Sequence, residues 1–364
     1  MTGLFCFVIL LVCFALVKSS SRYPNSKGYA LFRPQALFAL LLFSLFVGLR
    51  YNPDVDKDFM AYWEAAEGSL IYYKYDRFEL LPRLLADFVH YFHLPPSVWF
   101  ILMGAILMAF TLFAACRIDN KYMPIVFVGL LLMYLQFDMN VMRQGIAISV
   151  FLCAATYMAD RNWKMFLLFM AIAFGFHRSS IIWVLLYPMT FLDYSGKYKK
   201  IIFFVVCLSA LAVITVPLIL DRMSFVLSIL GKQSKNDIIS YVNELEIEQG
   251  SGIGVIIQCV RWLFLLYYIP KIFRMESDNR LLILLSIFVI GTVMNLFVRY
   301  NMLLARMSLF PMIIELLLYP YVIDYGRKNA KSGWVIKAMT IMQVVFLSYC
   351  LYRYLNEWNF VPIG

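Results

Sequence analysis

The stretch Phe137–Leu152, FDMNVMRQGIAISVFL, passes from charged and amide side chains directly into an apolar run. The polar part holds Asp138, Asn140, Arg143 and Gln144, and the apolar part has the composition of a lipid-buried helix. A charged side chain at membrane depth costs about 2.5 to 3.5 kcal/mol and usually marks a pathway or a site. The stretch therefore predicts a membrane-spanning helix with a functional group at its mouth.

Apolar residues also dominate the rest of the chain. Of 364 residues, 63% are hydrophobic and only 15% are charged, a balance typical of multi-spanning membrane proteins. Apolar runs suited to a hydrocarbon core of about 30 Å recur without the period-two alternation of a barrel. The sequence predicts an all-α fold: one polytopic bundle over residues 1–364 with roughly twelve spans.

The loop charges predict the orientation of this bundle. Residues 48–77 carry four basic and six acidic side chains, and residues 221–254 carry three and five. Both segments are expected outside, whereas residues 193–200, 271–280 and 323–337 hold excess Lys and Arg and are expected in the cytoplasm. Both termini are then external. Because the net charge of +10 lies mostly in short loops, no nucleic-acid partner is predicted.

This orientation requires that one apolar segment between Arg77 and Asp193 does not cross the membrane. Phe78–Phe92 is the best candidate, because Glu79, Arg83, Asp87 and His90 form one polar stripe along a helix. We expect an interfacial or re-entrant amphipathic helix within an external loop over residues 50–96. A second external loop is expected over residues 221–254.

Five arginines gather on the predicted external side, where the charge rule does not explain them. They are Arg50, Arg143, Arg178, Arg299 and Arg306. A guanidinium group donates two parallel hydrogen bonds to an oxyanion. The cluster predicts a site for a phosphate or diphosphate.

Four motifs along the chain carry a family resemblance. MNVMRQGIAIS (Met139–Ser149) resembles the N-x-x-R-Q motif of EpsG-like, Wzy-type polysaccharide polymerases, and FHRSSII (Phe176–Ile182) resembles their F-H-x-S motif. DFMAYW (Asp58–Trp63) resembles their D-x-x-x-Y element, and RYNMLLARM (Arg299–Met307) resembles a late Arg-rich element. Order and spacing agree over roughly Gly48–Arg306.

The resemblance implies a glycosyltransferase of the bacterial inner membrane. It would polymerise oligosaccharide repeat units carried on undecaprenyl diphosphate, at the external face, for O-antigen, capsule or exopolysaccharide. Membrane lipid and a chain-length regulator are the other partners implied. Because arginines can neutralise the diphosphate leaving group, neither a metal nor another cofactor is expected.

Residue roles follow from the resemblance together with the chemistry of transfer. The attacking sugar hydroxyl needs a base, and an oxocarbenium-like centre gains from a carboxylate. The expected catalytic residues are Glu79, His177 and Asp58. The expected substrate- and diphosphate-binding residues are Arg50, Asn140, Arg143, Gln144, Arg178, Ser179, Arg299, Asn301 and Arg306. Tyr62 and Trp63 are expected to stack on sugars.

Several residues also have a purely structural interpretation. Arg143 would reach the interface as a snorkelling side chain, and Glu79 would pair only with Arg83 at i+4. His177 would be a structural histidine. Asp54 and Asp56 would be solvated loop residues.

Two other functions stay open from the sequence. Asp54-Val55-Asp56 imitates the acidic pair of membrane glycosyltransferases that use a metal and a sugar on a lipid monophosphate. EDTA sensitivity would identify such an enzyme. A transporter or flippase of the lipid-linked sugar is the third candidate, although no internal repeat is visible.

Overall fold

A computed structural model describes residues 2–22, 29–50, 58–69, 78–135, 141–192, 207, 252–276, 278–298 and 302–356. Within these ranges the regular structure is entirely helical, which confirms the predicted all-α class. The helices are α1 (Thr2–Ser20), η2 (Ala30–Phe32), α2 (Pro34–Gly48), α3 (Phe59–Glu67), α5 (Leu80–Tyr91), α6 (Ser97–Ile118), η3 (Asn120–Tyr122), α7 (Met123–Tyr134), α9 (Met142–Ala159), α10 (Trp163–Phe176), η4 (Arg178–Phe191), α14 (Gly252–Glu276), α15 (Asn279–Val298), α16 (Met302–Met312), α17 (Glu315–Lys328) and α18 (Ala330–Asn356).

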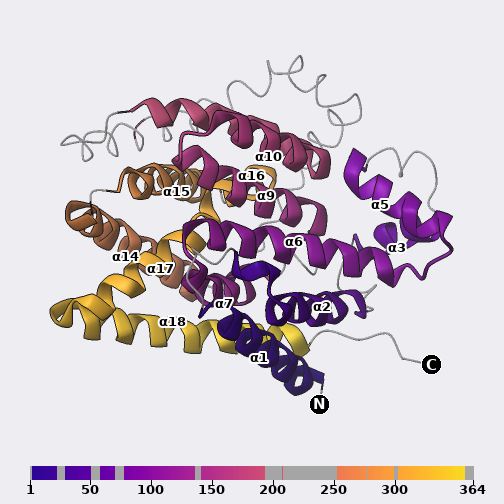
Figure 1. Ribbon diagram of the computed structural model, residues 1–364, viewed down its shortest axis with the longest axis horizontal. Helices are drawn as coiled ribbons and strands as arrows, with labels where there is room; N and C mark the ends of the chain where they lie inside the picture. The colour runs from indigo at the N-terminus through magenta and orange to yellow at the C-terminus, as the bar shows by residue number, and fades with distance from the viewer. Residues whose placement is uncertain are drawn as a thin grey trace.

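Helix α9 lies inside the bundle, between α6, α10 and α15 (Figure 1). Of its span, 94% of the residues are buried, against 17% for α18 at the edge of the bundle. Small residues such as Gly145, Ala147 and Ala154 line α9 and let neighbouring helices approach closely. The helix that carries Arg143 is therefore enclosed by protein rather than lipid.

The structure does not establish the predicted count of twelve spans. Four described helical segments are long and apolar enough to cross a membrane: Ser97–Ile118, Met142–Ala159, Arg306–Lys328 and Ser332–Tyr352. Five shorter apolar helices accompany them. Helix α7, for example, has 12 residues and rises only about 18 Å. Most of the predicted external loop over residues 221–254 lies outside the described residues.

The two segments on either side of His177 reach different lengths. Helix α10 has 14 residues and rises about 21 Å. The following 14 residues form a 3₁₀ helix, η4, which rises about 28 Å because each residue adds about 2 Å. The tighter winding brings η4 close to the hydrocarbon thickness of about 30 Å.

Helix α5 is the segment that we expect not to cross. Its 12 residues rise about 18 Å, well short of the hydrocarbon core. It packs with α3 at one end of the molecule, on the right of Figure 1. Trp99 of α6 donates from Nε1 to the Pro82 carbonyl (3.2 Å) and so fixes α5 on the bundle. Its location at a membrane surface stays a prediction.

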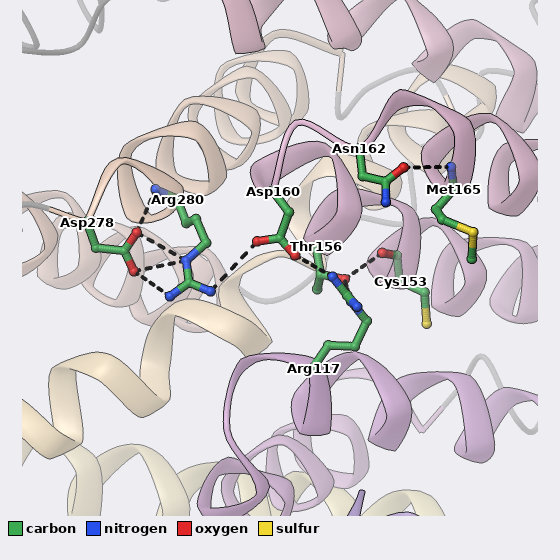
Figure 2. A network of polar contacts seen from close by, with 8 residues as sticks. All are labelled: Arg117, Cys153, Thr156, Asp160, Asn162, Met165, Asp278 and Arg280. Carbon is green, nitrogen blue, oxygen red and sulfur yellow. Dashed lines mark hydrogen bonds and ion pairs between the residues drawn. The ribbon is translucent and has the colours of Figure 1, made fainter. Parts of the chain in front are cut away.

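The loops expected on opposite sides of the membrane lie at opposite ends of α9. Arg143 is the second residue of α9 and Asp160 follows its last, so about 25 Å separate them along the axis. At the Asp160 end, Arg117, Asp160, Arg280 and Asp278 form one network (Figure 2). The residues of the predicted site gather at the Arg143 end.

Candidate functional site

An ion pair between Arg143 and Glu79 forms the centre of the site. Arg143 donates from its terminal nitrogen to Oε2 of Glu79 at 2.7 Å, and the side chains are 21% and 9% exposed. Glu79 is the N-cap residue of α5, and its side chain turns from the polar stripe of that helix into the bundle. The structural alternative in which Glu79 pairs only with Arg83 is wrong.

Aromatic rings hold the guanidinium group of Arg143 in place. Its Cζ lies 4.8 Å from the ring centre of Phe78 and 5.6 Å from that of Tyr62. Its Nε donates to the Tyr62 hydroxyl at 3.4 Å. Such cation–π contacts gain strength where water is excluded. Asp58, the N-cap residue of α3, lies near enough for a favourable Coulombic interaction with Arg143.

The FHRSS motif comes to the same carboxylate from the α10–η4 junction. The Arg178 backbone N–H donates to Oε1 of Glu79 at 3.4 Å, and the Arg178 side chain is exposed. The Ser179 hydroxyl lies 2.7 Å from Nδ1 of His177. In the described part of the chain no hydrogen bond reaches Nε2 of His177.

The imidazole of His177 is neutral at physiological pH. Burial lowers the pKa of His177 to about 4, the Glu79 carboxylate opposes this shift, and the guanidinium groups of Arg143, Arg306 and Arg178 add to it. A neutral imidazole can accept a proton or orient a hydroxyl. The charges of three arginines and of Glu79 therefore act on one histidine.

Gln144 has a positioning role at this site. Its Nε2 donates to the backbone carbonyl of Arg306 at 2.8 Å and so ties α9 to α16. Arg306, which is partly exposed, is thereby held beside α9. The N-x-x-R-Q motif therefore supplies Arg143 to the site and Gln144 to the contact that holds Arg306 beside α9.

The predicted roles of Arg50 and Tyr62 do not fit the observed packing. Arg50 is completely buried, donates to the Val47 carbonyl (3.3 Å) and to Sδ of Met142 (3.3 Å), and stacks over Phe100. Arg50 therefore packs behind the site residues and does not line an open surface. Tyr62 is 2% exposed and its ring stacks on Trp99 at 4.9 Å.

The buried ring of Tyr62 is thus unavailable to a sugar in this structure, because α6 covers it. Trp63 is partly exposed and stacks on Phe59, so its predicted sugar contact stays a prediction. Asn140, Arg299 and Asn301 lie outside the described residues, as do Asp54 and Asp56. Among the described residues, no group of three or more His, Cys, Asp or Glu side chains is placed to hold a metal ion.

Sequence reasoning missed Phe78 and a buried ion pair elsewhere in the bundle. Arg261 of α14 and Glu315 of α17 are 7% and 0% exposed and lie 2.9 Å apart, and the Tyr134 hydroxyl donates to Glu315. The signal was present, because an isolated Glu in the apolar run FPMIIELLLY predicts a buried partner. Together these three side chains join α7, α14 and α17.

A comparison with known protein families supports the predicted resemblance. A family model described as the EpsG family matches residues 35–362. Neither a curated protein nor a solved structure matches the chain.

Proposed function

Because the chain belongs to the EpsG family, we propose that it is a membrane glycosyltransferase that polymerises oligosaccharide repeat units carried on undecaprenyl diphosphate. The observation that carries this proposal is the convergence of Glu79, Arg143 and His177 from three separate segments. Further guanidinium groups, of Arg178 and Arg306, surround them. A carboxylate, an imidazole and several cations are the groups that transfer from a lipid diphosphate requires.

The proposed reaction exchanges one bond at the anomeric carbon of the growing chain. The bond from this carbon to the diphosphate oxygen breaks, and the diphosphate keeps the electron pair. A hydroxyl of the incoming repeat unit forms the new glycosidic bond and loses its proton to Glu79. The leaving diphosphate bears about two negative charges, which the arginines stabilise as the bond breaks.

The Arg143–Glu79 ion pair links substrate binding to this proton transfer. In the structure the guanidinium group occupies one Glu79 oxygen at 2.7 Å. A diphosphate competes for the same guanidinium donors, since phosphate oxygens accept bidentate hydrogen bonds from arginine. Binding of the lipid diphosphate therefore frees the Glu79 carboxylate, which then accepts the proton from the hydroxyl of the incoming repeat unit. His177, neutral and bonded to Ser179, orients the acceptor hydroxyl.

An assay of transfer tests the proposal. Purified protein and lipid-linked repeat units are expected to yield polymer in EDTA as well as without it. A deletion strain is expected to accumulate single repeat units on the outer side of the membrane. Repeat units trapped inside would indicate a flippase, and EDTA-sensitive transfer from a lipid monophosphate would indicate the metal-dependent enzyme class.

We also propose that the Arg143 end faces the outside of a bacterial inner membrane, with both termini on that side. The loop charges support it. Cysteine at Tyr91, which is 76% exposed, is expected to react with an impermeant reagent from outside.

Cysteine at Lys164, exposed near the opposite end of the bundle, is expected to react only after permeabilisation. Both variants are made in a chain without the native cysteines. External labelling at Lys164 and protection at Tyr91 would reverse the proposed orientation.

A further inference from the structure

A groove between helices α1, α7, α17 and α18 lies apart from the Arg143 end of the bundle. It has a volume of about 480 Å³. Its walls are largely apolar and include Val128, Leu132, Leu316 and Leu347. The flanking helices α1 and α18 expose many apolar side chains outward, among them Val12 and Val345. The groove therefore borders the part of the surface that faces lipid.

Cations gather at one mouth of this groove. The lining residues there are Lys18 and Arg22 at the end of α1, Lys121 just before α7, and Arg327 at the end of α17. The three helix ends meet because Lys121 bonds Asp324 of α17 (3.1 Å) and Asn120 accepts from Ala30, which follows α1 (3.0 Å).

Acidic groups offset only part of this charge. Asp119 and Asp324 both pair with Lys121, at 3.3 and 3.1 Å, and Asp324 also pairs with Lys328. In the described part of the chain no ion pair reaches Lys18, Arg22 or Arg327. These three cations line the groove mouth, and none of the described carboxylates pairs with them.

The depth of the groove fits one leaflet of a membrane. Its lining runs along η3 and α7 from Lys121 to Met133, about 18 Å at the helical rise. One leaflet contributes about 15 Å of hydrocarbon, half of the bilayer core. The hydroxyls of Ser21 and Thr340 in the wall donate to carbonyls of nearby residues (2.9 and 2.8 Å). The Tyr319 hydroxyl donates to Oε1 of Gln343 at 2.9 Å, and the apolar rest of the wall suits an acyl chain.

We propose that this groove binds an anionic glycerophospholipid, with one acyl chain between the four helices and the phosphate at Lys18, Arg22 and Arg327. A cationic rim above an apolar slot matches the two parts of such a lipid. A zwitterionic lipid has the same tails but no net charge for the rim. The site lies at the Lys121 end, distinct from the glycosyl-transfer site proposed above.

Retention of lipid by the full-length protein tests this site. Protein is purified in mixed micelles of phosphatidylglycerol and phosphatidylcholine and analysed by native mass spectrometry. We expect one retained phosphatidylglycerol per chain and little phosphatidylcholine. The combined change Lys18→Gln, Arg22→Gln and Arg327→Gln is expected to reduce retention at least tenfold.

Two matched controls separate the groove from general effects. Removing the exposed charges of Arg161, Lys164 and Lys337 changes the net charge equally and is expected to leave retention unchanged. Val344→Trp, at a 39% exposed residue in the groove wall, is expected to block retention. The adjacent Val345→Trp, 64% exposed and outside the lining, is expected to retain lipid.

Three results would overturn the proposal. Equal retention of both lipids would show that the rim does not select charge. Retention that survives both the triple Gln change and Val344→Trp would place the lipid elsewhere. A dimer mass without lipid that Val344→Trp dissociates would show that a second copy of the chain fills the groove.

Discussion

Two arginines lie near opposite ends of α9, Arg143 within that helix and Arg117 at the end of α6. Each pairs with a carboxylate and lies over a tyrosine ring, but the other charged groups near them differ. Arg143 pairs with Glu79 and lies over Tyr62, whereas Arg117 pairs with Asp160, donates to Thr156 at 3.0 Å and lies 3.5 Å over Tyr157. Around Arg117 the charges alternate in sign, through Asp160 to Arg280 and Asp278 (Figure 2).

Around Arg143 the charged groups act on a histidine. The cations of Arg143, Arg178 and Arg306 lower the pKa of His177, Glu79 raises it, and Asp58 interacts favourably with Arg143. A closed alternating network holds helices together, whereas several arginines beside one histidine offer donors to an anion. The comparison teaches that an Arg–carboxylate pair alone does not identify a site. The further arginines that act on His177, and the histidine itself, do.

The largest expected difference between the ends comes from their carboxylates. Glu79→Gln is expected to reduce transfer by purified protein roughly 100-fold or more, the scale of a lost general base. Asp160→Asn removes a carboxylate that is 34% exposed, where an ion pair is worth about 0–1 kcal/mol. We expect it to leave transfer within about twofold of the parent. Equal losses in both variants would indicate that either change simply disturbs the bundle.

The histidine sharpens the assignment at the Arg143 end. His177→Ala is expected to lower transfer on the order of 10-fold, less than the loss of the base, because the ring orients the acceptor. His90→Ala, at an exposed ring near the same end, is the control and is expected to retain activity. If His177→Ala is inactive while Glu79→Gln works at the parental rate, the histidine is the base.

A smaller effect concerns stability and pH. The pKa of His177 falls from 6.5 to about 4 in the folded protein, so the unfolded chain binds the proton more readily between these values. The contribution of His177 to the free energy of unfolding is present above pH 6.5 and is lost as the pH falls toward 4. Between pH 6.5 and 5 the loss reaches about 2 kcal/mol.

Thermal unfolding in detergent measures this effect. The drop in midpoint between pH 7 and pH 5 is expected to be smaller for His177→Gln than for the parent. The same drop in both proteins would show that His177 is not held neutral by the fold.

Much of this arrangement was predictable because hydropathy and loop charge act along the chain. Glu79 and the motif residues Arg143, His177 and Arg306 lie at one end of the bundle, since helices of alternating direction return them there. Packing between distant segments was not predictable in this way. Arg50 and Tyr62 are buried because Phe100 and Trp99 of α6 cover them. The sequence near positions 50 and 62 does not predict those contacts.

The number of membrane spans could not be predicted from the sequence for a related reason. Hydropathy detects apolar runs, but it does not distinguish an α-helix from the 3₁₀ winding of η4. It also does not tell a short buried helix such as α7 from a full span. Length in residues therefore converts poorly into distance across the membrane.

The paired substitutions Arg143→Lys and Arg117→Lys test the central claim most directly. Each keeps the charge and removes the planar fork, so only a site that binds a phosphate group in bidentate fashion is expected to fail. Transfer is measured with purified protein, lipid-linked repeat units and equal amounts of folded enzyme. We expect Arg143→Lys to lose most polymerisation and Arg117→Lys to keep it, with at most a lower unfolding temperature. Normal-length polymer from Arg143→Lys, together with loss of polymer in Arg117→Lys, would contradict the assignment of the Arg143 end as the catalytic face.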